Sequence, residues 1–226
     1  MTSVEVNTTS LLIELPLDLI VLIASYFSMK DQRTLSHCSK SYRTMMRTAN
    51  LIRYKLSYES CERYVDDLFY RDVVDSRGHV WEFILYGSNS LVDVTFLSRV
   101  HTVMLNNCRA VIDVSPLSTV HTLTLFYMSG VTDVSALSSV HTLTLNNMSG
   151  VRDVSALSSV HTLTLKWMSG VRDVSALSSV HTLTLVRMYG VRDVSALSSV
   201  HTLTLRDMYG VTDVSSLSAV PNLTII

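Results

Sequence analysis

From residue 80 to the last residue, the apolar and polar positions of the chain follow one 20-residue pattern. The copy at residues 140–159 reads VHTLTLNNMSGVRDVSALSS. Each full copy opens on a valine: Val80, Val100, Val120, Val140, Val160, Val180 and Val200. A truncated copy fills residues 220–226. This self-similarity indicates a repeat protein, because a unit of about 20 residues has too little apolar surface to fold alone and must stack on its neighbours.

Each copy predicts one strand followed by one short turn. Leu143, Thr144 and Leu145 alternate between apolar and polar, which is typical of a strand with one buried face. Asp153 precedes the segment VSAL and is expected to cap a short helical or 3₁₀ turn. Gly150 stands where the chain leaves the strand, and we expect a positive φ angle there.

The pattern resembles that of leucine-rich repeats, L-x-x-L-x-L-x-x-N/C-x-L, and is most similar to the cysteine-containing subtype. Cys108 occupies the N/C position of its copy, and the V-x-D segment of that subtype follows at residues 111–113. Later copies place methionine there, which can fill the same buried volume: Met128, Met148, Met168, Met188 and Met208. The resemblance implies a solenoid over residues 80–226, with seven full repeats and a terminal strand. Its eight parallel strands would line a concave face.

Residues 1–79 lack the repeat and show helical spacing instead. The apolar residues recur at the period of a helix: Leu19, Ile20, Ile23 and Phe27. We expect a small helical unit over residues 11–50 and a helical linker over residues 51–79 that caps the solenoid, which makes the whole chain an α+β repeat protein. The helical unit carries more apolar residues than about 40 residues can bury internally, and this surplus indicates a partner.

The helical unit resembles an F-box. It follows the opening of that family, L-P-x-[DE]-[LI]-[LI]-x-x-[IL]-x-x-[YF]-[LF], at Leu15, Pro16, Asp18, Leu19, Ile20, Ile23, Tyr26 and Phe27. It also follows the closing pattern C/S-x-K-x-[WY]-R, at Cys38, Lys40, Tyr42 and Arg43. Near-identical 20-residue repeats behind an F-box resemble the expanded families of giant DNA viruses.

An F-box implies docking onto the Skp1 adaptor of a cullin-RING ubiquitin ligase, so that the repeats present a protein substrate. The residues that the resemblance assigns to Skp1 contact are Leu15, Pro16, Ile20, Ile23 and Leu35. Each of them fits equally well into the internal core of the helical unit. The implied location is the cytoplasm, or the cytoplasm or nucleus of a host cell if the protein is viral.

Variation among the copies concentrates in the two residues that follow the strand. These pairs are Asn106-Asn107, Phe126-Tyr127, Asn146-Asn147, Lys166-Trp167, Val186-Arg187 and Arg206-Asp207. Aromatic residues and arginine are enriched at interface anchors, whereas neutral drift at exposed positions is the alternative explanation. The predicted substrate-binding surface comprises Phe126, Tyr127, Lys166, Trp167, Arg187 and Arg206. Neighbouring columns could extend it through Tyr86, Arg109, Arg152, Arg172, Tyr189, Arg192 and Tyr209.

Two columns of titratable residues scarcely vary. The aspartate column precedes each predicted turn, so capping is favoured over a metal ladder: Asp93, Asp113, Asp133, Asp153, Asp173, Asp193 and Asp213. The histidine column would stack its rings about 4.8 Å apart: His101, His121, His141, His161, His181 and His201. Metal ligands must converge on one point, which a flat ladder does not achieve, so no metal site is predicted. We expect these histidines to titrate below their ordinary pKa through mutual repulsion.

Composition narrows the functional classes. The chain is 47% hydrophobic and 16% charged, with a formal net charge of −1. This content excludes a charge-rich disordered protein, and the near-zero net charge disfavours nucleic acid as a partner. The densest apolar run, over residues 11–27, contains two acidic residues and a proline and is shorter than a membrane span. The three cysteines form neither a disulfide framework nor a metal motif and are expected to be buried thiols.

We find no catalytic constellation and no cofactor fingerprint in the sequence, so the chain is not expected to be an enzyme or to bind a cofactor. The leading hypothesis is a non-catalytic, intracellular protein-binding adaptor of a Skp1-cullin-F-box ligase. The alternative is a leucine-rich-repeat scaffold or decoy that binds a host protein without recruiting a ligase. The apolar terminal residues Ile225 and Ile226 also suggest end-to-end self-association.

Overall fold

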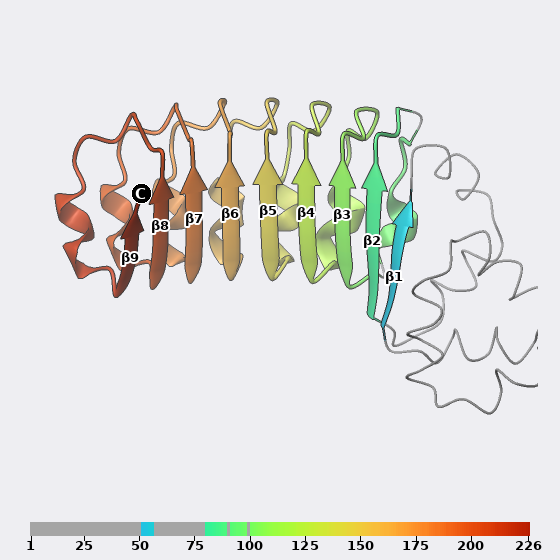
Figure 1. The fold of residues 1–226 in the computed structure, drawn as a ribbon, viewed down its shortest axis with the longest axis horizontal. Helices are drawn as coiled ribbons and strands as arrows, with labels where there is room; N and C mark the ends of the chain where they lie inside the picture. Colours follow the sequence, from blue (N-terminus) through green and yellow to red (C-terminus); the bar gives the residue numbers. More distant parts are fainter. Residues whose placement is uncertain (1–50, 57–79, 90, 99) are drawn as a thin grey trace, which may run out of the picture.

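The computed structural model describes residues 51–56 and 80–226, except residues 90 and 99. Within these residues, nine parallel strands form one sheet in sequence order (Figure 1). The strands are β1 (Leu51–Leu56), β2 (Val80–Tyr86), β3 (Thr102–Asn106), β4 (Thr122–Phe126), β5 (Thr142–Asn146), β6 (Thr162–Lys166), β7 (Thr182–Val186), β8 (Thr202–Arg206) and β9 (Asn222–Ile225). The 3₁₀ turns are η1 (Thr95–Leu97), η2 (Ser115–Thr119), η3 (Ser135–Ser139), η4 (Ser155–Ser159), η5 (Ser175–Ser179), η6 (Ser195–Ser199) and η7 (Ser215–Ala219).

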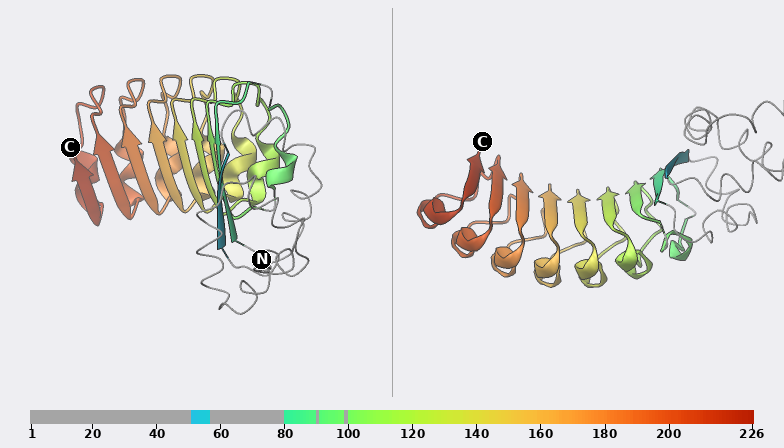
Figure 2. Two further views of the ribbon diagram at one scale, coloured as in Figure 1. Left: turned by 45° about the vertical axis from the view of Figure 1, so that its right-hand side comes forward. Right: turned by 90° about the horizontal axis from the view of Figure 1, so that it is seen from below.

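Each residue of a strand pairs with the equivalent residue of the strand in the next repeat. Leu143 of β5, for example, pairs with Leu123 of β4 on one side and with Leu163 of β6 on the other. Equivalent residues therefore form columns across the sheet. Figure 2 shows that the strands line the inner side of a shallow arc and the 3₁₀ turns its outer side. The predicted solenoid of leucine-rich-repeat type, with a parallel sheet on its concave face, is confirmed.

Strand β1 corrects one expectation. The helical linker predicted over residues 51–79 begins instead with this strand, which pairs in parallel with β2 from Leu51↔Val80 to Leu56↔Leu85. Residues 51–56 read LIRYKL, in which polar and apolar residues alternate after the first position, as in a strand rather than a helix. Without β1, β2 would be an edge strand of the described sheet, and its pairing with β1 extends the ladder by one strand. The rest of the predicted linker lies outside the described residues.

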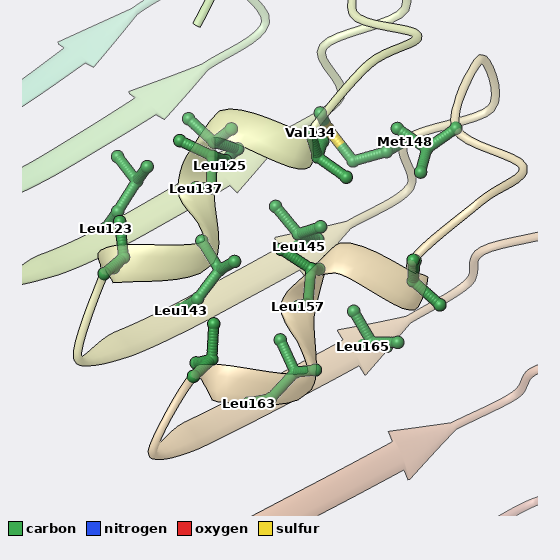
Figure 3. Packing of buried hydrophobic residues seen from close by; sticks show 14 of the residues in the cluster. Leu123, Leu125, Val134, Leu137, Leu143, Leu145, Met148, Leu157, Leu163 and Leu165 are labelled. Carbon is green, nitrogen blue, oxygen red and sulfur yellow. The ribbon is translucent and has the colours of Figure 1, made fainter. Parts of the chain in front are cut away.

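The core is a continuous stack of identical apolar layers. The strand leucines Leu143 and Leu145 are fully buried, and they pack against the turn leucine Leu157 and the column residue Met148 (Figure 3). Full burial of such a side chain contributes roughly 1.5–3 kcal/mol relative to exposure. Because every central repeat supplies the same set, each layer covers the next.

The cysteine position of the motif is part of this core. The side chain of Cys108 is fully buried, and burial raises the pKa of its thiol. Met128, Met148, Met168 and Met188 occupy the same column and are equally buried. The expected replacement of cysteine by methionine as a volume-filling residue is confirmed for these four repeats. Cys38 and Cys61 lie outside the described residues.

The repeat glycine has a different role from the expected one. Among the described glycines, Gly87 has a positive φ, whereas Gly150 does not. The left-handed residue of that repeat is Asn147, with φ 54°, immediately after β5. Glycine is required at position 150 because there is no room for a side chain: a Cβ atom there would lie 2.6 Å from the carbonyl oxygen of Val131 in the preceding repeat.

Polar side chains hold the outer turns in place. The backbone N–H of Ser155 donates to Asp153 Oδ1 at 2.8 Å, and the other six aspartates of the column accept the equivalent bond from the residue two positions on. Each aspartate thus accepts a backbone N–H at the start of its turn, as expected, but the N-cap residue is the valine that follows, such as Val154, rather than the aspartate itself. A column of serines, which was not predicted, links successive turns: Ser159 Oγ, for instance, donates to the carbonyl oxygen of Ser138 at 2.8 Å.

Strand β9 forms the last rung of the described sheet, and its outer side is exposed. Leu223 and Ile225 are 37% and 53% exposed, although their counterparts in central repeats lie in the core, and Ile226 is 69% exposed. These residues are the basis of the expected end-to-end association, which stays a prediction.

Candidate binding edge at the strand ends

All six residues of the predicted substrate-binding surface lie where strands end. Phe126, Lys166 and Arg206 are the last residues of β4, β6 and β8. Tyr127, Trp167 and Arg187 directly follow β4, β6 and β7. Because the strands are parallel, these residues share one edge of the solenoid, the upper edge in Figure 1. We call it the strand-end edge.

The strand-end edge is chemically more varied than the solvent-facing side of the sheet. The solvent-facing side of the sheet carries nearly uniform threonines, such as Thr142 and Thr144 of β5, which are partly buried. The strand-end edge carries asparagine, lysine, arginine and aromatic residues at equivalent positions. A surface that discriminates between partners needs such variety, which the concave face lacks.

The residue immediately after each of the strands β3 to β8 has a left-handed backbone. The φ angles are 56° at Asn107, 53° at Tyr127, 54° at Asn147, 56° at Trp167, 53° at Arg187 and 52° at Asp207. The conformation lets the backbone N–H continue the ladder, as where Trp167 donates to the carbonyl oxygen of Val186 at 3.0 Å. Asparagine and aspartate tolerate this region, whereas bulky residues there cost on the order of 1 kcal/mol or more. Tyr127, Trp167 and Arg187 are therefore held in strained positions.

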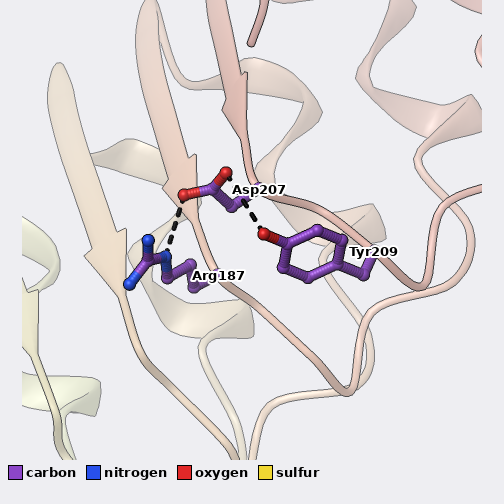
Figure 4. A network of polar contacts seen from close by, with 3 residues as sticks. All are labelled: Arg187, Asp207 and Tyr209. Atoms are coloured by element: carbon purple, nitrogen blue, oxygen red, sulfur yellow. Dashed lines mark hydrogen bonds and ion pairs between the residues drawn. The ribbon is translucent and has the colours of Figure 1, made fainter.

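One group of these residues forms a connected cluster over the last repeats. The guanidinium carbon of Arg187 lies 4.5 Å from the centroid of the Trp167 ring, in a cation–π contact. Arg187 Nε donates to Asp207 Oδ2 at 2.8 Å, and this hydrogen bond raises the pKa of Arg187 (Figure 4). Tyr209 Oη lies 3.5 Å from the second oxygen of Asp207. The cluster thus spans three consecutive repeats.

Two tyrosines complete this cluster. Tyr189 meets Trp167 edge-on at a centroid distance of 6.0 Å, and it is nearly parallel to Tyr209 at 6.2 Å. Tyr189 is 47% exposed and Tyr209 is 72% exposed. Both tyrosines belong to a column that was expected to extend the predicted surface, whereas Asp207 was not among its predicted residues. The sequence did hold a signal that could have identified Asp207, because it is the second residue of the variable pair Arg206-Asp207.

The other members of the predicted surface lie apart from the cluster. Phe126 and Tyr127 belong to β4 and the residue after it, two strands from Trp167, and Tyr127 is 51% exposed. Lys166 and Arg206 form no side-chain hydrogen bond or ion pair with any described residue. The structure therefore places the six residues on one edge, and it joins two of them, Trp167 and Arg187, in one contact network.

The opposite edge of the sheet carries the histidine ladder. Successive rings stack at centroid distances of 4.5–4.6 Å with interplanar angles of 12–17°. In each repeat Nδ1 lies 3.1–3.3 Å from the hydroxyl of the following threonine. Burial and the neighbouring imidazoles of His201 and His161 lower the pKa of His181, the direction that mutual repulsion predicts.

Among the described residues, no group of three or more histidine, cysteine, aspartate or glutamate side chains is arranged so that it could hold a metal ion. Over the same residues, no helix has the length and apolar content needed to cross a membrane. The five residues assigned to Skp1 contact lie outside the described part of the chain.

The comparisons with known proteins bear on both parts of the chain. Residues 12–54 match the sequence model of the F-box domain. No curated protein sequence matches the chain significantly. Among solved structures, the chain is similar to the functional domain of InlJ from Listeria monocytogenes, which includes a cysteine ladder. That match has 14% sequence identity and a TM-score of 0.32, and covers 81% of this chain and 54% of the InlJ chain.

None of these matches supports the resemblance to viral families, which stays a hypothesis. The F-box match covers the segment in which the motif was recognised, and the described residues 80–226 form the repeat solenoid. The chain thus combines a match to the F-box domain at residues 12–54 with a solenoid of leucine-rich-repeat type that begins at residue 80.

Proposed function

We propose that this protein is a non-catalytic adaptor of a Skp1-cullin-F-box ubiquitin ligase. The F-box at residues 12–54, placed ahead of a repeat solenoid, is the observation that carries this proposal. F-box domains serve as protein-binding modules of such ligases. In this arrangement the F-box binds a Skp1-type adaptor, and the solenoid holds a protein substrate within reach of the ubiquitin-charged enzyme.

The proposed Skp1 contacts are the apolar positions of the F-box motif, namely Leu15, Pro16, Ile20, Ile23 and Leu35. The apolar surplus of this short unit supports a role at an interface, since about 40 residues cannot bury all of it internally.

The proposed substrate contacts lie on the strand-end edge and include Phe126, Tyr127, Lys166, Trp167, Arg187 and Arg206. The strained backbone at Tyr127, Trp167 and Arg187 supports this assignment. Neutral drift would favour residues that suit a left-handed backbone, as asparagine does at two positions of the same column.

Co-purification tests the first half of the proposal. The full chain, co-expressed with Skp1, is expected to form a stable complex. Leu15→Asp should abolish that complex, because it places a charge at an apolar contact, and Pro16→Ala should weaken it. Trp167→Ala is the matched control and should leave Skp1 binding unchanged, since it lies on the solenoid.

Failure to bind Skp1 would overturn the ligase proposal, as would binding that Leu15→Asp leaves unchanged in a variant that still folds. The melting temperature of the solenoid and the circular dichroism spectrum establish that the variants fold. A protein that captures its target but never co-purifies with Skp1 or a cullin would instead be the scaffold or decoy of the alternative hypothesis.

A further inference from the structure

A short column of arginines runs beside the aromatic cluster. Arg152, Arg172 and Arg192 occupy the same position of three consecutive repeats, flanked by Thr132 and Thr212 in the repeats on either side. Each arginine stem lies against the glycine of the next repeat. A Cβ atom on Gly190 would lie 3.2 Å from Cγ of Arg172, and one on Gly210 would lie 3.7 Å from Cγ of Arg192. The small glycine thus lets each arginine extend across the neighbouring repeat.

A surface hollow lies between two of these arginines. It has a volume of about 590 Å³ and is lined by Ser169, Arg172, Tyr189, Gly190, Arg192 and Asp193. Tyr189 belongs to the aromatic cluster described above, since it contacts Trp167 edge-on and lies parallel to Tyr209. The hollow therefore joins the arginine column to that cluster.

The guanidinium groups at this hollow have no acidic partner in the described part of the chain. Asp193 lines the hollow, but its carboxylate accepts the backbone N–H of Ser195 at 2.8 Å and hydrogen bonds from Ser195 lower its pKa. Asp173 is engaged in the same way by Ser175. Both carboxylates are ionised, and both accept hydrogen bonds within their own turns.

The positive charge of Arg187, at the rim of the cluster, is already paired with an acidic side chain. Arg187 Nε donates to Asp207, and its guanidinium group lies over the ring of Trp167. Positive charge without a hydrogen-bonded counter-charge therefore remains on Arg172 and Arg192, and on Arg152 one repeat before them.

We propose that this hollow and its arginine column bind a carboxylate-rich segment of a partner protein. Guanidinium groups present paired N–H donors that match a carboxylate, and exposed tyrosines are typical interface anchors. The proposal rests on the proposed function in one respect: the partner would be the protein that the adaptor presents.

The distribution of the charges favours an acidic peptide over other anions. The arginines lie one to a repeat across three repeats, which suits single carboxylates spaced along a segment rather than one compact phosphate group. The column of ionised aspartates beside the arginines repels any anionic ligand, and this repulsion is greater for the continuous phosphate backbone of a nucleic acid than for single carboxylates that each pair with one arginine.

Fluorescence anisotropy with a defined peptide tests this inference on the full chain. The probe is the fluorescein-labelled peptide Gly-Glu-Glu-Tyr-Glu-Glu-Gly, and its neutral counterpart carries glutamine in place of every glutamate. We expect the acidic peptide to bind and the neutral one to bind at least about fivefold more weakly. Each exposed ion pair changes affinity by up to about fivefold, so Arg172→Gln with Arg192→Gln should weaken binding roughly tenfold.

The double variant Arg172→Lys with Arg192→Lys is the control, because it keeps both positive charges at the hollow. It should bind the acidic peptide more tightly than the double glutamine variant does. Equal binding of both peptides, or no binding of either, would overturn the proposal. Unchanged binding by the double glutamine variant would overturn it as well. Tighter binding of a single-stranded RNA oligonucleotide than of the acidic peptide would also overturn it.

These outcomes are independent of the ligase proposal. Arg172 and Arg192 lie on the solenoid, so their double variant should still co-purify with Skp1. Loss of Skp1 binding through Leu15→Asp should leave the affinity for the acidic peptide unchanged.

Discussion

A Cβ atom on Gly170 would lie 2.5 Å from the carbonyl oxygen of Val151 in the preceding repeat. The same close approach recurs at Gly190, where the carbonyl oxygen of Val171 would be 2.5 Å away. Side-chain carbons do not approach backbone oxygens so closely, so the glycine column sets how tightly neighbouring repeats can stack. In the copy at residues 100–119 this place holds Ala110, and nothing in the structure explains that exception.

Gly170→Ala should therefore destabilise the solenoid. The added methyl group must push two rigid backbone segments apart, and overpacking of this kind costs typically 1–3 kcal/mol. Urea denaturation followed by circular dichroism measures the change in the free energy of unfolding. Ser169→Ala, at the exposed neighbouring position, is the control and should change it by less than about 0.5 kcal/mol. A midpoint for Gly170→Ala equal to that of the wild type would show that the repeats can separate at no cost.

Tyr127→Asn should have the opposite effect and raise stability. Tyr127 has φ 53° and is 51% exposed, so its side chain contributes little burial to offset the left-handed backbone. Asparagine tolerates this conformation, as it does at Asn107 and Asn147, and the gain is expected to be about 0.5–1 kcal/mol.

The melting temperature of this variant is the measurement. Tyr189→Asn is the control, because Tyr189 is similarly exposed but does not have a positive φ, so asparagine should bring no gain there. If Tyr127→Asn lowers the melting temperature, the side chain makes a stabilising contribution that outweighs the backbone strain, and strain no longer argues for a binding role.

Much of the fold follows from the sequence because each element repeats. The buried and outward-facing positions of residues 143–145 alternate as predicted, and Asp153 accepts a backbone N–H at the start of the turn that was expected after it. A local rule that is read once in a repeat applies in every copy, so the parallel register and the stacked core could be predicted together.

What could not be predicted depends on contacts between repeats. The left-handed residue lies at Asn147 rather than Gly150, because the ladder continues one residue beyond the strand and because Gly150 is pressed against Val131. Strand β1 was missed because its pairing with β2 joins residues from outside the repeat pattern. The hollow beside Tyr189 depends on how arginine stems cross the next repeat, and a column alignment cannot show that direction.

The stacked histidines predict that the solenoid loses stability on acidification. Burial and the adjacent imidazoles of His201 and His161 lower the pKa of His181 in the folded state, whereas an unfolded histidine titrates near pH 6.5. Below about pH 6.5 the unfolded chain therefore binds more protons than the folded chain, which favours unfolding. The contribution of His181 to stability is fully present above this pH and is lost as the pH falls through the lower pKa of the folded state.

Melting temperatures at about pH 7.5 and about pH 5 measure this loss. Hydrogen bonds from Ser155 lower the pKa of Asp153 below its ordinary value of about 3.9, and the other aspartates of the column with lowered pKa values behave likewise, so they stay ionised over this range and do not contribute. Replacing His121, His161 and His201 with glutamine leaves the remaining rings two strands apart and removes their direct repulsion. This triple variant should lose less stability than the wild type between the two pH values. An equal loss in both proteins would show that proton binding to the ladder is not coupled to folding through ring stacking.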